Sequence, residues 1–179
     1  MVRIGLMRHF PVEEPLPTGW RTAAELHEWR QRYDSAGVTP GLIDVGGTAW
    51  QKCFSSDLKR AYTTAQAAHA GEITQTPLLR EIEVHPFRTG RLSLPVWAWR
   101  WMVRTAWLTS HESQRTARDD FRQRVQAVAD MLDAEQSDTL VVSHAGMMMY
   151  LRRELIRRGF GGPKFGIADN ARLYVFERR

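Results

Sequence analysis

Two short apolar runs, far apart in the chain, each end at a histidine. The first covers residues 2–7 and is followed by Arg8 and His9, and the second covers residues 139–143 and is followed by His144. Runs of this length are typical of buried strands. In open α/β sheets, ligands bind outside the carboxyl ends of the strands. We therefore expect both histidines at the same edge of one sheet, in a ligand site.

The rest of the chain alternates between strand-like and helix-like segments. Strands are expected at 52–55, 76–79 and 172–176, and helices from Thr18 or Thr22 to about 32, then at 57–70, 118–135 and 147–158. This alternation predicts an α/β fold, a three-layer α/β/α sandwich with a mostly parallel central sheet. The length of 179 residues favours a single domain over residues 1–179.

The composition is ordinary for a globular chain, with a mild basic excess. Hydrophobic residues make up 43% and the formal net charge is +5, but the arginines are scattered. A small anionic partner accounts for such an excess, and no nucleic acid is expected. There is no apolar stretch of about 18 residues, so no membrane span is predicted. The single cysteine, Cys53, can form no internal disulfide, which favours a reducing, cytoplasmic location.

The segment 95–108 contains four of the seven tryptophans and is expected to form a helix. Drawn as a helix, it places Arg100 and Arg104 on one narrow edge and aromatic side chains over most of the remainder. Such a helix is not an ordinary half-exposed element. The alternatives are burial by its own core or by a homodimer partner, a cap that walls an apolar part of a substrate, and a helix on a membrane surface. We expect residues 90–115, approximately, to form an insertion or cap.

Four segments resemble the signatures of the histidine phosphatase superfamily, also called phosphoglycerate-mutase-like. The Arg8-His9 pair matches the Arg-His of its first signature, and SSDLKRA at 55–61 is similar to its second. The segment 79–82 resembles the one that carries the general acid, and 141–146 resembles the second-histidine segment. The matches come in the family's order and extend over nearly the whole chain. In length the chain is similar to the short phosphatase branch.

The resemblance implies a phosphatase that hydrolyses a small phosphorylated metabolite through a phosphohistidine intermediate on His9. Glu81 would be the general acid, His144 would act in both catalysis and substrate binding, and Arg8 and Arg60 would bind the phosphate. It implies a reaction without metal and without any other cofactor. Hydrolysis of phosphohistidine proteins and a catalytically degraded phosphate-binding or scaffold protein remain the alternatives.

Physical chemistry supports these roles. A phosphomonoester needs its equatorial oxygens held, and Arg8 and Arg60 can each donate a fork of hydrogen bonds. Neutral His9 is a competent nucleophile near pH 7. His144, if protonated, would add a third positive donor, and we expect the backbone N–H groups of the following helix to point at the anion. We also expect no carboxylate to oppose these donors.

Two departures from the family pattern concern the surroundings of the site. Phe10 stands where family members usually carry glycine, so the pocket floor is expected to differ. Glu81 is followed by Glu83 and His85 rather than by a glycine-rich run. Either of these two side chains could share or replace the proton-transfer role of Glu81.

Overall fold

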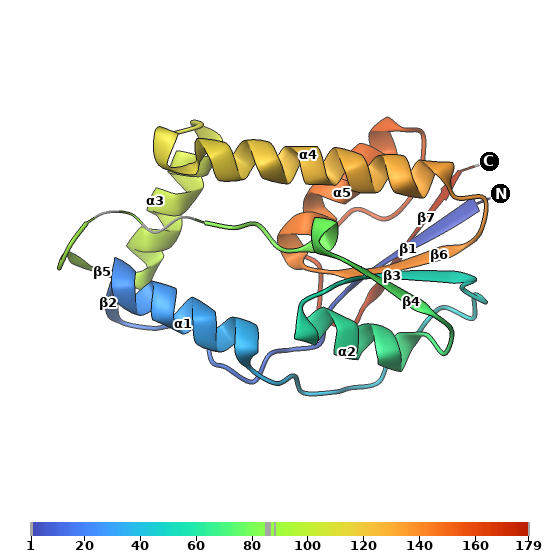
Figure 1. The fold of residues 1–179 in the computed structure, drawn as a ribbon, viewed down its shortest axis with the longest axis horizontal. Helices are drawn as coiled ribbons and strands as arrows, with labels where there is room; N and C mark the ends of the chain where they lie inside the picture. Colours follow the sequence, from blue (N-terminus) through green and yellow to red (C-terminus); the bar gives the residue numbers. More distant parts are fainter. Residues whose placement is uncertain (1, 85–86, 88, 179) are drawn as a thin grey trace.

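A five-stranded sheet lies at the centre of the computed structural model, which describes residues 2–84, 87 and 89–178 (Figure 1). The strand order is β4-β3-β6-β1-β7, with neighbours β3 and β4, β3 and β6, and β1 and β6 parallel and only β7 antiparallel to β1. The bounds are β1 (Val2–Arg8), β3 (Lys52–Ser56), β4 (Ile73–Thr76), β6 (Thr139–Ser143) and β7 (Leu173–Arg178). The predicted mostly parallel sheet is confirmed.

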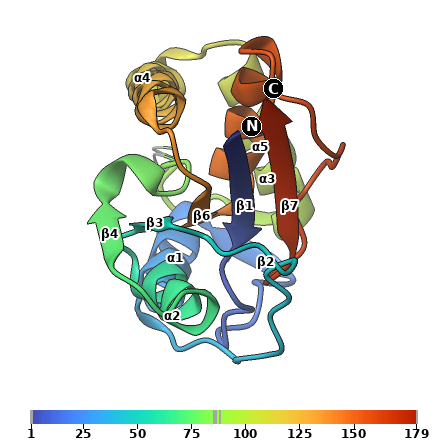
Figure 2. The same ribbon diagram turned by 90° about the vertical axis from the view of Figure 1, so that its right-hand side faces the viewer.

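Helices cover both faces of this sheet. Helices α4 (Glu112–Ala134) and α5 (Ala145–Arg157) pack on one face, and α2 (Lys59–Ala68) packs on the other, where α1 (Ala23–Ser35) lies next to it (Figure 2). Successive residues of β1 alternate between the faces, because side chains of a strand alternate. Leu6 joins the core under α4 and α5, and Met7 joins the core under α2. The predicted three-layer sandwich is confirmed.

The pairing of β1 with β6 positions the two histidines. Arg8 is in register with Ser143, so His9 and His144 follow directly at the same edge of the sheet. The central residues of both strands are apolar and buried on both faces, as central parallel strands require. The expectation that these strands are parallel neighbours is confirmed.

Several boundaries differ from those expected. The strand expected at 76–79 is wrong: β4 ends at Thr76, and Pro77–Leu79 form a 3-10 turn. Proline at residue 77 has no N–H for a strand ladder, and the Thr76 side chain accepts from the backbone N–H of Leu78. Helix α4 begins at Glu112 instead of 118, because the side chain of His111 caps its first turn. Helix α2 begins at 59 rather than 57.

Thr22, rather than Thr18, starts helix α1. Its hydroxyl accepts from the Glu25 backbone N–H at 3.2 Å, and the Glu25 carboxylate accepts from the Thr22 backbone N–H at 2.7 Å. This reciprocal pair is a capping box. The helix runs to Ser35, a few residues beyond the expected end. Asp34 therefore lies in its last turn, where it contacts the site described below.

A second, two-stranded ribbon lies away from the main sheet and was not expected. It consists of β2 (Trp20–Thr22) and β5 (Ser93–Pro95), which are antiparallel, and it leads into helix α3 (Val96–Leu108). The Trp99 indole is buried and donates to the backbone carbonyl of Arg21 at 2.7 Å, so α3 is anchored to this ribbon. Figure 1 shows α3 at the far end of the molecule from the chain termini.

The tryptophans of α3 divide into two groups. Trp99 and Trp107 are buried, whereas Trp97 and Trp101 are 67% and 66% exposed. One face of the helix therefore packs on its own chain, and the other faces outward. Among the described helices, none is long and apolar enough to cross a membrane.

Candidate active site

The site is centred on His9 and His144, which the paired ends of β1 and β6 bring together. Their ring centroids are 5.1 Å apart, and both side chains are buried. The backbone N–H of His9 donates to the Ser143 carbonyl at 3.0 Å, which continues the ladder past the end of β1. The expected convergence of the two imidazoles is thus present.

Hydrogen bonding fixes the tautomer of His9. Its Nδ1 lies 2.6 Å from the Phe10 carbonyl oxygen, which can only accept, so Nδ1 carries the proton and Nε2 carries the lone pair. Burial lowers the pKa of His9 to about 3; the Phe10 carbonyl opposes this, and the charges of Arg60 and Arg8 add to it. His9 is therefore a neutral imidazole near pH 7, with its basic nitrogen at Nε2.

His144 carries its proton on the other nitrogen. Arg60 Nε, which is always a donor, is 3.3 Å from His144 Nδ1, so the proton lies on Nε2 and faces the Ser56 hydroxyl at 3.0 Å. Burial first, and then the charge of Arg60, hold the pKa of His144 well below its usual range. His144 is therefore neutral in the ligand-free protein, because a buried ring beside an arginine does not gain a proton, and the condition for a third positive donor is not met there.

Arg60 is held between His144 and a carboxylate. It is 2% exposed, its Nη1 donates to Asp34 Oδ1 at 2.8 Å, and its guanidinium lies 5.2 Å from the centroid of the Tyr33 ring. Asp34 also accepts from Arg30 Nε at 3.1 Å. The expectation that no carboxylate opposes the donors is therefore wrong. The guanidinium is nevertheless not turned away from the histidines, since its Nε faces His144.

Arg8 approaches the site from the end of β1. Its Nη1 donates to the Ala168 carbonyl at 2.9 Å, and its buried Nε has no hydrogen-bond partner among the described residues. The Asn170 side chain donates to the His9 carbonyl at 2.6 Å, which ties the loop before β7 to the same place. A buried N–H without a partner is costly, and an oxyanion bound here would supply the acceptor.

Phe10 contributes its backbone to the site and its side chain to the core. The ring is 1% exposed. Its N–H donates to the Thr64 hydroxyl at 2.8 Å, and that hydroxyl donates to the Arg60 carbonyl, also at 2.8 Å. The chain after His9 is thus fixed to helix α2. The aromatic side chain in place of the family glycine fills buried space and is not among the residues that line the cavity described below.

Glu81, two residues after the 3-10 turn at Pro77–Leu79, lies against the first turn of helix α5. Its carboxylate accepts from the backbone N–H of Gly146 at 3.1 Å and from that of Met147 at 3.3 Å. These N–H groups, expected to be open to an anion, are therefore bound to Glu81. Glycine at 146 permits this approach, since a Cβ there would lie 2.4 Å from Glu81 Oε1. Glu83 is exposed near the same place, and His85 is outside the described residues.

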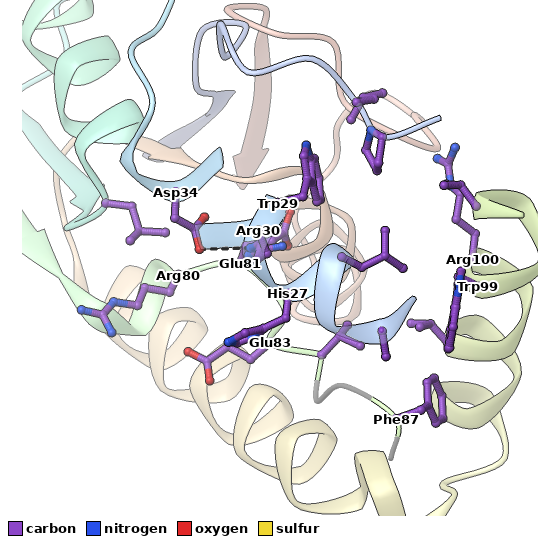
Figure 3. A pocket seen from close by; sticks show the side chains of 18 residues that line it. His27, Trp29, Arg30, Asp34, Arg80, Glu81, Glu83, Phe87, Trp99 and Arg100 are labelled. Atoms are coloured by element: carbon purple, nitrogen blue, oxygen red, sulfur yellow. Dashed lines mark hydrogen bonds and ion pairs between the residues drawn. The ribbon is translucent and has the colours of Figure 1, made fainter. Parts of the chain in front are cut away.

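A cavity of about 620 Å³ adjoins this centre, between α1, α3 and the segment that follows Glu81. Asp34 and Glu81, which contact Arg60 and the start of α5, are among its walls. Figure 3 shows Asp34 and Arg80 at one end and Phe87 and Trp99 at the other. The cavity thus extends from Asp34 and Glu81, which contact residues of the site, to the tryptophan-rich helix.

Sequence reasoning missed Asp34, Ser56 and Thr64. In the sequence, Asp34 resembles an ordinary helix-surface residue paired with Arg30 four positions earlier. Ser56 and Thr64 lie within or beside the second signature, but nothing in their spacing indicates contacts with His144 and Phe10. Among the described residues, no group of three or more histidine, cysteine, aspartate or glutamate side chains is arranged to hold a metal ion.

Comparison with solved structures shows the same fold. A proposed alpha-ribazole-5'-P phosphatase from Escherichia coli K-12 has a TM-score of 0.61 at 19% identity, over 98% of this chain and 90% of that one. A phosphoserine phosphatase from Entamoeba histolytica, solved with 3-phosphoglyceric acid, has a TM-score of 0.51 at 14% identity, over 88% of this chain and 81% of that one. YhfR from Bacillus stearothermophilus gives 0.50 at 20% identity, with the same coverages.

The search of curated proteins found no match. The sequence model of the histidine phosphatase superfamily (branch 1) matches residues 44–179, which include Arg60, Glu81 and His144. Together with the fold, this match supports a phosphatase role and shows that the chain belongs to the histidine phosphatase superfamily, branch 1.

Proposed function

We propose that the protein hydrolyses a small phosphomonoester through a phosphohistidine formed on His9. One observation carries the proposal: a buried imidazole that holds its proton on Nδ1 against the Phe10 carbonyl, beside Arg8, Arg60 and a second histidine. This arrangement keeps the Nε2 lone pair available over a wide pH range. Arg60 and Arg8, whose charges act on this ring, are donors suited to a phosphate dianion.

In the first step, Arg8 and Arg60 bind the phosphate oxygens, and His9 Nε2 attacks phosphorus. The P–N bond forms as the bond to the leaving oxygen breaks. Glu81, which takes up a proton before this step, gives that proton to the departing alkoxide. The phosphorylated ring is cationic, and the Nδ1–H that it presents to the Phe10 carbonyl stabilises that charge. His144 is neutral when the substrate binds and donates a hydrogen bond through Nε2. The bound dianion then stabilises the protonated form of this ring.

In the second step, water attacks the phosphorus and Glu81, now a carboxylate, accepts its proton. The P–N bond breaks, its electron pair returns to His9 Nε2, and inorganic phosphate leaves. Asp34 fixes the guanidinium of Arg60 through Nη1 and so positions the charge that both steps need. The arginines would thus supply the positive charge that metal ions provide in other phosphatases, without a metal cofactor.

We also propose that β5 and α3 form a cap beside this site. Val96, Trp99 and Val103 of α3 line the cavity that Glu81 borders, which supports this role. A second subunit packed on the exposed Trp97 and Trp101 stays a prediction, as does a cytoplasmic location.

Trapping the intermediate tests the proposal. With a ³²P-labelled phosphomonoester and rapid alkaline quench, we expect acid-labile, base-stable label on His9. The variant His9→Asn keeps a side-chain donor for the Phe10 carbonyl but has no nucleophile, so it should bind phosphate without label or turnover. Label on another residue would overturn the assignment.

The same assay separates the alternative functions. Hydrolysis of a phosphohistidine peptide alone, with no small ester cleaved, would indicate a protein phosphatase. Phosphate binding at the site without turnover of any ester would indicate a catalytically degraded binding protein.

A further inference from the structure

The cavity beside the histidines is much larger than a phosphate group requires. Its volume is about 620 Å³, within the usual range for sites of small organic ligands. At about 30 Å³ per water molecule, this equals roughly 20 waters. An organic group of about ten or more heavy atoms therefore fits beside a phosphate held at Arg8 and Arg60.

The walls of the cavity are mostly apolar. Eleven of its 18 lining residues have apolar side chains. The apolar walls come from both sides, with Leu26 and Trp29 on α1 and Val96, Trp99 and Val103 on α3. A polyhydroxylated group bound here would lose hydrogen bonds to water and find few replacements.

Most charged side chains of the cavity lie toward one end, where several are already paired, whereas Arg100 lies at the other end, beside Trp99 (Figure 3). Arg30 donates to Asp34, and Arg80 forms a two-bond pair with Asp57. Figure 3 shows Asp34 and Arg80 at this end and the rings of Phe87 and Trp99 at the other. Those two rings stack with centroids 6.2 Å apart. The cavity thus has a charged end bordered by Asp34 and Glu81 and a mostly apolar end at the cap, where Arg100 is the charged group (Figure 3).

We propose that the natural substrate is an amphiphilic phosphomonoester, with an apolar organic group bound between α1 and α3. This rests on the proposed phosphatase function and names its substrate class. The phosphate binds at Arg8 and Arg60, the ester oxygen lies near Glu81, and the apolar group extends toward Phe87 and Trp99. Compact hydroxylated esters bind their phosphate equally well but leave the apolar end unfilled.

A series of n-alkyl phosphates tests the proposal with constant leaving-group chemistry. We expect kcat/KM to rise from methyl through butyl and hexyl to octyl phosphate, by up to about fourfold for each fully buried methylene. The esters are used at concentrations at which they remain monomeric. Octyl phosphate should exceed glucose 6-phosphate, a hydroxylated ester of similar size, by at least about tenfold.

Variants on the walls locate the preference. Leu26→Asn, which keeps the approximate shape of the side chain, should reduce the rise with chain length and leave the rate on methyl phosphate unchanged. Val96→Thr on the opposite wall should act in the same way and serves if the first variant folds poorly. Trp101→Gln, exposed on α3 and outside the lining of this cavity, is the matched control and should keep the full rise.

Failure of this inference and failure of the proposed function give different results. Equal kcat/KM on all alkyl esters and on glucose 6-phosphate would retain the phosphatase and overturn the amphiphilic substrate. If kcat/KM still rises with chain length in both Leu26→Asn and Val96→Thr, the apolar group does not bind between α1 and α3, and the proposal is overturned. No phosphate release from any ester would overturn the phosphatase function itself.

Discussion

Replacing His9 should make the protein more resistant to acid. Burial lowers the pKa of His9 to about 3 from 6.5. An unfolded chain has no such burial, so its histidine takes up a proton below about pH 6.5. Between these two pKa values the unfolded state binds more protons than the folded state. The free energy of unfolding therefore falls as the pH falls through this window.

The size of the effect follows from the two pKa values. At about pH 4.5, protonation of this histidine in the unfolded state lowers the free energy of unfolding by about 3 kcal/mol relative to neutral pH, because the folded imidazole is still unprotonated. The contribution of His9 to the pH dependence reaches about 4 kcal/mol when the pH reaches its folded pKa. In His9→Asn no group titrates at this position, so this contribution disappears, while the amide can still donate to the Phe10 carbonyl.

Urea unfolding from about pH 7.5 to 4.5 measures this directly. We expect the stability of wild type to fall by about 3 kcal/mol more than that of His9→Asn over this interval. Carboxylates affect both proteins alike and cancel in the difference, whereas the variant also removes the smaller contribution of His9 to the lowered pKa of His144. The variant His27→Asn, at an exposed position on α1, controls for the removal of a histidine.

Parallel pH curves for wild type and His9→Asn would refute the reasoning. They would mean that His9 takes up protons equally in both states, so that burial does not keep it neutral. The proposed nucleophile would then lose its main electrostatic support.

Two further predictions concern residues next to the histidines. In Gly146→Ala, the new Cβ would lie 2.4 Å from Glu81 Oε1 and displace the carboxylate, although alanine favours helix by about 1 kcal/mol. We expect kcat on alkyl phosphates to fall about 100-fold or more, and that on p-nitrophenyl phosphate, whose leaving group needs no proton, to fall much less. Equal losses would argue against Glu81 as the acid. In Phe10→Ala, loss of the buried ring should lower the free energy of unfolding by about 3–5 kcal/mol, measured in urea; a loss below about 1 kcal/mol would show that the ring is not part of the core.

The main sheet could be predicted because its strands carry local signals. The run before Arg8 and the run before His144 are mostly apolar, as strands buried on both faces must be. Parallel neighbours place their carboxyl ends together, so the convergence of His9 and His144 followed from sequence and topology. The ribbon of β2 and β5 could not be predicted, because strands of three residues contain no measurable periodicity.

The residue types of the site were thus set by the sequence, whereas their charge states and partners were set by the tertiary structure. Asp34 contacts Arg60 across 26 residues of chain, Glu81 contacts Gly146 across 65, and His144 contacts Ser56 across 88. No local pattern encodes such contacts, because they depend on how separate helices and strands pack. The same packing buries His9 and His144 and keeps them neutral, since a charged ring loses its hydration there and meets the field of Arg60.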